Sequence, residues 1–297
     1  MVGAEATGRV WAMSKSTTVA RATRPGFEEG GCLFRGSKAT IGVCRNALAR
    51  SLPEMTFPQL THPPLREALV DIQLRDELPL TWMGKLENLD FDGFVYVHLM
   101  KHGQFRFAIP EDQPARAEVT ADQPLGRRYD KKDGTQVLQV RRNGMTISIL
   151  KNYTNWDALR DVARDKWNKY LDISGPVGVS RLALRYINGI EMLFGADYDD
   201  YLTAGPRIPG PLPQMVSNFI QRVEVPFEKH NATAIITQTL ETPVADKRAA
   251  VLDIDVFSLC SLDGRSPEVW SILDRLRTIA NDIFFSSVTK KVIESYL

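Results

Sequence analysis

The sequence predicts an α+β fold of antiparallel sheets backed on one face by long amphipathic helices. Three observations lead to this class. Several segments alternate apolar and polar residues with the period of two that half-buried strands show, and residues 66–74 are the clearest. Two stretches, at about 155–171 and 267–285, repeat apolar residues at helical spacing instead. Between two further strand-like segments, the pair Asn143-Gly144 is typical of a tight hairpin turn.

The predicted elements fall into two topologically similar halves, residues 55–178 and 179–297, within one compact core. Each half begins with a strand, continues through antiparallel strands and ends in a long amphipathic helix. No residue-level repeat accompanies this order, so an internal pseudo-duplication is a hypothesis about topology alone. Residues 1–54 are rich in Gly, Ser, Thr and Arg. We expect them to be a disordered tail or an extension ahead of a true start at Met55.

The remaining segments are assigned from the same signals. Residues 94–99 and 104–109 are strand-like on either side of Gly103, which predicts a hairpin, and the Pro-rich stretch 110–124 predicts a loop. Residues 195–214, rich in Gly and Pro, predict a second long loop. Residues 219–228 and 232–240 predict another hairpin.

Composition narrows the class of protein. Of 297 residues, 43% are hydrophobic and 25% charged, as in ordinary globular proteins, and a net charge of +1 provides no global field that would attract nucleic acid or an anionic membrane. No apolar stretch is long enough to span a membrane. Only Cys260 lies outside residues 1–54, so no disulfide framework is expected. We therefore predict a cytoplasmic protein without a membrane partner.

Two strand-like segments carry paired charges. Arg181 and Arg185 lie four residues apart in one segment, and Asp253 and Asp255 lie two apart in the other. Alternate residues of a strand share a face, so each pair projects to one side of the sheet. We favour cross-strand pairing of the arginines with the aspartates. The alternative is that Asp253 and Asp255 hold Mg²⁺ through their oxygens in a phosphoryl-transfer or nucleic-acid-processing enzyme.

Glu67 and Asp71, from the strand at 66–74, extend this set of charges. Together they predict a charged open face, built from Glu67, Asp71, Arg181, Arg185, Asp253 and Asp255. The leading hypothesis is a non-enzymatic binding or regulatory module that engages a protein partner through this face or the 195–214 loop. Neither the identity of that partner nor any catalytic residue follows from the sequence.

The familiar catalytic signatures are missing, among them the P-loop, the Rossmann glycine run and the His-Glu-x-x-His and Gly-x-Ser-x-Gly motifs. No cofactor is therefore expected apart from the Mg²⁺ alternative. A further alternative is a polyanion or nucleic-acid binder that uses a basic concentration within residues 127–142. Asp130 and Asp133 interrupt that concentration, so nucleic acid is not the favoured partner. Its arginines are Arg127, Arg128, Arg141 and Arg142.

A series of motifs in fixed order adds a resemblance. The series begins with Pro63-Pro64-Leu-Arg-Glu67, continues through Ile149-Leu-Lys-Asn-Tyr153 and Arg185-Tyr-Ile-Asn188, and ends with Leu252-Asp-Ile-Asp-Val-Phe257 and Ile283-Phe-Phe-Ser-Ser-Val-Thr289. In this order the chain resembles a sporadically distributed family of bacterial proteins of unknown function, over about residues 56–297. The resemblance implies a cytoplasmic bacterial protein. The family's scattered occurrence implies an association with mobile elements, such as phage-defence or toxin–antitoxin loci. The resemblance brings no established catalytic residues to transfer to this chain.

Overall fold

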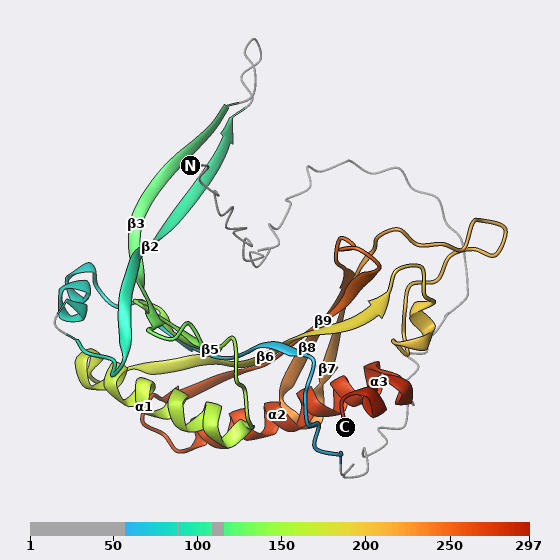
Figure 1. Ribbon diagram of the computed structural model, residues 1–297. Coiled ribbons are helices and arrows are strands. Elements are labelled where there is room, and N and C mark those ends of the chain that lie inside the picture. The colour runs from blue at the N-terminus through green and yellow to red at the C-terminus, as the bar shows by residue number, and fades with distance from the viewer. Residues whose placement is uncertain (1–56, 88, 109–115) are drawn as a thin grey trace, which may run out of the picture. The chain divides into compact units, whose positions relative to one another are not determined.

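A single nine-stranded antiparallel sheet dominates the computed structural model, which describes residues 57–87, 89–108 and 116–297 (Figure 1). The strands lie in the order β2-β3-β4-β5-β1-β6-β9-β8-β7. They are β1 (Leu65–Leu74), β2 (Phe94–Ala108), β3 (Arg116–Lys131), β4 (Gln136–Arg141), β5 (Gly144–Ile149), β6 (Gly178–Leu193), β7 (Ile220–Phe227), β8 (Ala232–Leu240) and β9 (Lys247–Asp263). The helices are α1 (Trp156–Ser174), α2 (Glu268–Ser287) and α3 (Lys290–Ser295), with short 3-10 turns at η1 (Leu80–Leu86), η2 (Tyr198–Asp200) and η3 (Glu228–His230).

The predicted fold class is wrong. The fold is mostly strand, with 42% strand against 26% helix, and it does not consist of two α+β halves that each back a sheet with long helices. The reason is the pairing of β1 with β6, which joins the early and late strands into one sheet. Periodicity within a segment predicts a strand but not which distant strand it pairs with. For this reason β1 and β6, which are neighbours at the centre of the sheet, belong to separate halves in the prediction.

The β2–β3 ribbon also differs from the prediction. Residues 94–108 form one long strand rather than a hairpin around Gly103, and β3 includes Pro124 within the stretch predicted as a loop. Register shifts interrupt the β2–β3 pairing at three places, one of them between Met100 and Lys101. Such irregularities let a strand continue through Gly and Pro, which would otherwise be read as its ends.

The β4–β5 hairpin is present, but its turn is displaced by one residue from the prediction. Arg141 pairs with Gly144, so Arg142 and Asn143 are the central residues and neither has a positive φ. The predicted position of the turn, at Asn143-Gly144, is therefore wrong by one residue. Gly144 has a φ of 139°, a backbone conformation that favours glycine. A side chain is also excluded there by space, because a Cβ would lie 2.0 Å from the carbonyl oxygen of Ile72 in β1.

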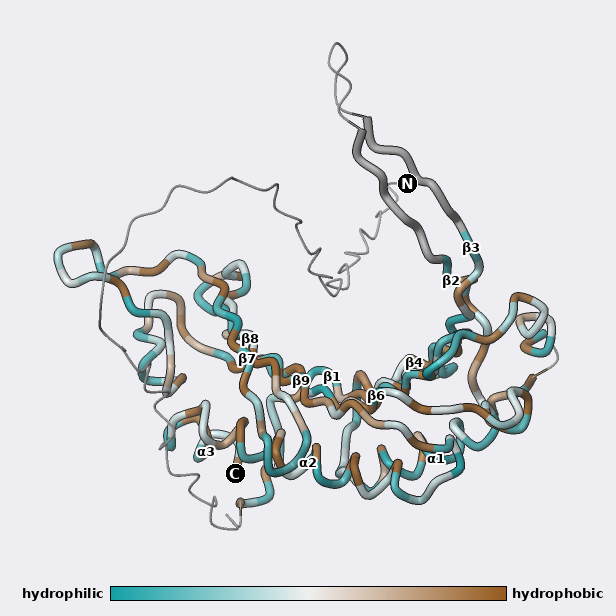
Figure 2. Tube along the Cα trace, turned by 180° about the vertical axis from the view of Figure 1, so that it is seen from behind, coloured by the Kyte–Doolittle hydropathy of each residue, from teal (hydrophilic) through white to brown (hydrophobic). Residues whose placement is uncertain are grey.

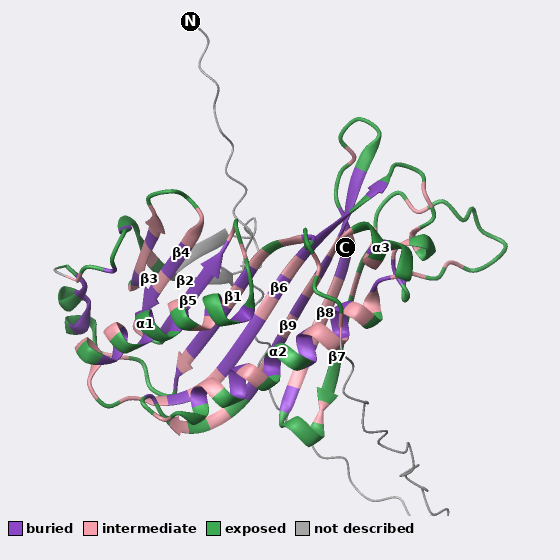
Figure 3. Ribbon diagram, turned by 60° about the horizontal axis from the view of Figure 1, so that its bottom comes forward, coloured by how far each residue is buried: buried purple, intermediate pink, exposed green. Residues whose placement is uncertain are grey.

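The hydrophobic core lies between one face of the sheet and the helices. Ala68, Val70 and Ile72 of β1 point to this face and are fully buried. Helix α1 packs on β1 and β5, whereas α2 packs on β6 and β9 (Figure 3). Along α2, hydrophobic and hydrophilic residues alternate at the spacing that turns one stripe toward the sheet (Figure 2). At the start of α1, the Asn155 side chain accepts a hydrogen bond from the Ala158 N–H, as an N-cap does.

The opposite face of the sheet, called the open face below, carries no helix among the residues described. The sheet ends at β2 on one side and at β7 on the other. Within the described ranges, no helix is both long enough and apolar enough to cross a membrane. The predictions for residues 1–54 and for a start at Met55 concern residues outside those ranges.

Candidate functional site

The predicted charged residues come together because of strand register. Asp71 of β1 lies opposite Ala183 of β6 on one side and Thr146 of β5 on the other. Further across the sheet, Arg185 of β6 lies opposite Asp255 of β9. Directly opposite residues in an antiparallel pair share a face, so these side chains all project from the open face.

Asp71 is the centre of the arrangement, and its carboxylate is buried beneath longer side chains. One of its oxygens accepts hydrogen bonds from Arg141 and from the Thr146 hydroxyl, each at 2.6 Å. Its other oxygen accepts from Gln73 at 2.9 Å and from Arg181 at 3.3 Å. Burial by itself would raise the pKa of Asp71, but the charge of Arg141 and the Thr146 hydrogen bond outweigh it and hold this pKa below its ordinary value.

Arg181 links two strands. Its guanidinium donates to Asp71 and, at 3.4 Å, to Asp255, and its Cζ atom lies 4.6 Å from the ring centroid of Phe257. Among the described residues, this long contact is the one hydrogen bond that reaches the Asp255 carboxylate. Burial, together with the negative charges of Asp253 and Asp71, raises the pKa of Asp255 above its ordinary value despite the neighbouring arginines.

Arg185 and Asp253 make the best-formed pair of the face. Arg185 donates through both Nε and Nη2 to the two oxygens of Asp253, with the Nε contact at 2.7 Å. This two-pronged geometry is the strong form of an arginine–carboxylate pair, and the hydrogen bond to Asp253 raises the pKa of Arg185. The predicted pairing of Arg181 and Arg185 with the two aspartates is confirmed. Glu67 lies on the same face of β1 and adds to the negative field around Arg185.

These observations define the central network, an alternating set of charges that runs across β4, β1, β6 and β9. Its members are Asp71, Arg141, Arg181, Arg185, Asp253 and Asp255. Three positive and three negative side chains balance one another within it. The arrangement therefore neutralises its own charges and leaves no surplus positive or negative charge for a ligand.

The four arginines of the basic concentration within residues 127–142 each pair with a different carboxylate. Arg141 belongs to the central network, and Arg128 pairs with Asp130 at 2.7 Å. Arg127 pairs with Glu87 at 3.1 Å. Arg142 pairs with Glu77 at 2.9 Å and donates to the Leu78 carbonyl. All four arginines of the nucleic-acid alternative thus have a carboxylate partner.

The metal alternative places Mg²⁺ at Asp253 and Asp255. Both oxygens of Asp253 accept hydrogen bonds from Arg185, and Asp255 faces Arg181. A cation there would compete with two guanidinium groups. Among the described residues, no group of three or more His, Cys, Asp or Glu side chains is arranged to hold a metal ion.

Sequence reasoning missed several residues of the network and its surroundings. Thr146 and Gln73 bind Asp71, and Phe257 stacks beneath Arg181. The alternation of β5 and β9 places Thr146 and Phe257 on the correct face, and that signal was available. Their partners were not, because the register of β1 with β5 and β6 cannot be read from any single segment.

The 195–214 loop lies near a second kind of surface. Large apolar side chains are exposed on this loop and beside it, in contrast to the paired charges of the open face. We call this set the loop-end surface: Leu193, Phe194, Leu212, Met215 and Val244. Met215 is the most exposed of them, at 82%.

Backbone contacts hold these segments at the same end of the sheet. The Phe194 N–H donates to the Asp246 carbonyl at 2.8 Å, next to the turn that carries Val244. Arg248 connects the loop to that turn, because it donates to the Ser217 carbonyl at 2.9 Å and lies over the Phe194 ring. These contacts fix Phe194, the turn that carries Val244 and the end of the loop at Ser217 to one another, and Leu212 and Met215 lie on the loop just before Ser217.

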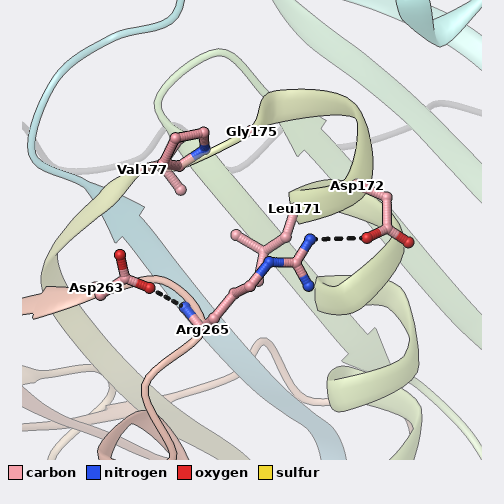
Figure 4. Close-up of a pocket in the computed structure, with 7 residues that line it drawn as sticks. Leu171, Asp172, Gly175, Val177, Asp263 and Arg265 are labelled. Atoms are coloured by element: carbon pink, nitrogen blue, oxygen red, sulfur yellow. Dashed lines mark hydrogen bonds and ion pairs between the residues drawn. The ribbon is translucent and has the colours of Figure 1, made fainter.

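A shallow pocket of about 290 Å³ lies elsewhere, between the end of α1 and the turn after β9 (Figure 4). Arg265 crosses it to pair with Asp172 at 2.8 Å, and its backbone N–H bonds to Asp263. None of the sequence-predicted site residues lines this pocket.

Comparison with protein-family models, with curated proteins and with solved structures finds no match to the chain.

Proposed function

We propose that this protein is a binding module that engages another protein through the loop-end surface. The exposure of large apolar side chains on that surface is the observation that carries the proposal. Single exposed apolar residues are common, but several on segments that hydrogen bonds fix together are typical of an interaction site. Loops held by a rigid sheet are also where binding residues concentrate.

The paired charges of the open face favour the loop-end surface, rather than the open face, as the binding site. A partner that used the central network would have to break ion pairs that are already made and partly buried, at a cost of several kcal/mol. Contact with Leu212 and Met215 removes apolar surface from water without breaking such a pair. The partner expected is a protein with a complementary apolar patch, because the loop-end surface supplies mainly apolar area.

The test is affinity capture from the native host with the full-length protein and a matched pair of variants. Leu212→Ser/Met215→Ser removes two exposed apolar side chains from the loop-end surface. The control Leu80→Ser/Leu297→Ser removes two that are exposed elsewhere, at 48% and 56%. We expect a stoichiometric partner with the wild type and the control, and at least a tenfold lower recovery with the loop variant.

Equal recovery of the same proteins with all three forms would refute the proposal. Thermal unfolding of the two variants checks that neither has lost its fold, since all four positions are exposed and each change is expected to alter stability little.

A further inference from the structure

Strand β7 ends the sheet with an unusually exposed edge. Most of its residues are exposed, including Ile220 at 77%, Val223 at 41% and Val225 at 36%, and it stands out as the exposed strand in Figure 3. Within the described ranges no strand pairs with its outer side. Free backbone groups on a sheet edge are a template for another strand, so natural edges are usually short, covered or blocked.

The outward-facing backbone groups of β7 can be assigned from register. The Glu241 N–H donates to Ala249 on the β9 side of β8, so by alternation the even-numbered residues of β8 face β7. These pair with odd-numbered residues of β7, such as Val223 with Ile236. The N–H and C=O groups of Arg222 and Glu224 therefore point away from the sheet. Pro226 is also even-numbered, so its backbone nitrogen faces outward as well. A proline is tolerated there because the missing N–H would not have bonded to β8.

The side chains of this edge are self-complementary. Arg222 and Glu224 flank Val223 and project from the open face, since Glu224 aligns through Ile235 with Asp255. If a second copy pairs antiparallel about Val223, each Arg222 lies opposite the Glu224 of the other copy, and both backbone groups of each residue find partners. We propose that two copies of this chain associate in this way, joining their sheets across β7.

The same side chains discriminate against neighbouring registers. Pairing centred on Arg222 would set arginine against arginine, and pairing centred on Glu224 would set glutamate against glutamate. Only the register centred on Val223 converts both charges into opposite pairs. Charged residues on an edge strand usually hinder pairing with any other strand. Here Arg222 and Glu224 would instead permit pairing with one partner in one register.

The other face of β7 supports the same partner. Val223 and Val225 project to the helix side, where α2 packs on β6 and β9 rather than on β7. In the proposed dimer the two Val223 side chains meet on the symmetry axis, and Val225 meets Gln221 of the second copy. Such a two-fold contact removes exposed apolar surface from water and closes after two copies.

The test measures the mass of the full-length protein by sedimentation over about 1 to 200 µM, the range in which a modest interface associates. The wild type is expected to become dimeric. Arg222→Glu and Glu224→Arg each set like charges opposite one another and should shift association to at least tenfold higher concentration. The double variant Arg222→Glu/Glu224→Arg restores opposite pairs and should restore the dimer.

A cysteine pair fixes the register independently. In Val223→Cys the two introduced thiols lie directly opposite and should form an intermolecular disulfide on mild oxidation, identified by peptide mass. Gln221→Cys is the matched control, because it lies on the same face of β7 but about 13 Å from its counterpart in the dimer. It should not form a disulfide with itself.

Each outcome decides the proposal. A monomer at every concentration overturns it, which includes the case in which residues 1–56 of the same chain cover the edge. A dimer that both single variants leave intact, or that the double variant fails to restore, overturns it as well, because another surface then makes the contact. The loop variant Leu212→Ser/Met215→Ser is expected to remain dimeric, so this test and the partner capture can fail separately.

Discussion

At the centre of the open face, polar groups are buried and paired, whereas at the β7 end of the sheet apolar groups are exposed and the outer backbone groups pair with no other strand of the described residues. Asp71 accepts hydrogen bonds from four side chains. Met215 and Ile220, by contrast, are mostly in contact with water. The titratable side chains that stand out in the sequence thus mostly pair with one another within the fold. The association that we propose uses instead residues that look ordinary in the sequence.

The largest expected effect is on stability, at the centre of the network. Asp71→Asn keeps the shape of the side chain but leaves Arg141 buried without its counter-charge. We expect a loss of about 3 to 5 kcal/mol in the free energy of unfolding, measured by urea denaturation. Arg265→Ala, which removes the exposed pair with Asp172, is the control and should cost less than about 1 kcal/mol. Similar losses in both variants would erase the contrast between buried and exposed charge.

The pH dependence of stability sharpens the same contrast. The pKa of Asp71 is lowered in the folded protein, so its ionised form stabilises the fold above the unfolded value of about 3.9, and this contribution is lost as pH falls through the folded pKa. The stability difference between wild type and Asp71→Asn should therefore narrow as pH falls from about 7 to about 3. Denaturation across that range measures it, and a constant difference would contradict the assignment.

A smaller effect is expected at Asp255. Its pKa is raised, so protonation favours the folded state. This contribution is complete below the unfolded pKa and is lost as pH rises through the folded pKa. At neutral pH the ionised Asp255 carboxylate therefore destabilises the fold. The free energy of unfolding of Asp255→Asn should lie within about 1 kcal/mol of the wild-type value or exceed it. A loss comparable to that of Asp71→Asn would show that Asp255 is a full member of the stabilising set.

The smallest expected effect is that of a divalent cation. Because Arg185 and Arg181 hold Asp253 and Asp255, adding Mg²⁺ should leave the unfolding temperature unchanged relative to NaCl of equal ionic strength. A rise in the wild type that disappears in Asp253→Asn/Asp255→Asn would instead support the metal-dependent enzyme.

Much of the network could be predicted from the sequence, because alternation within a strand fixes which side chains share a face. That signal puts Arg181 and Arg185 on one face of their strand and Asp253 and Asp255 on one face of theirs. Their pairing across two strands was a hypothesis that the register of β6 with β9 bears out. It could not place Arg141 on Asp71, since the two lie in different strands and meet only through the pairing of β5 with its neighbours on both sides. Register between strands distant in the sequence depends on the whole core, not on any one segment.

The fold class was missed for the same physical reason. The helical stripes of α1 and α2 are strong local signals, whereas the pairing of β1 with β6 is set by tertiary packing. The long β2 and β3 strands were hidden by Gly103 and Pro124, because both residues usually end strands. The exposure of β7 was also beyond the sequence, since an edge strand and an inner strand can share one pattern.

The claim that the charged face serves the fold is tested most directly by a double-mutant cycle on Asp71 and Arg141. Urea denaturation of Asp71→Asn, Arg141→Met and the double variant gives the coupling energy between the two side chains. We expect the double variant to be more stable than the sum of the single losses predicts, by about 2 kcal/mol or more, because neither single variant can satisfy the charge it leaves behind. Single losses that add to the double loss within about 0.5 kcal/mol would contradict the claim that this pair stabilises the fold. Asp71 and Arg141 would then be candidates for a functional role.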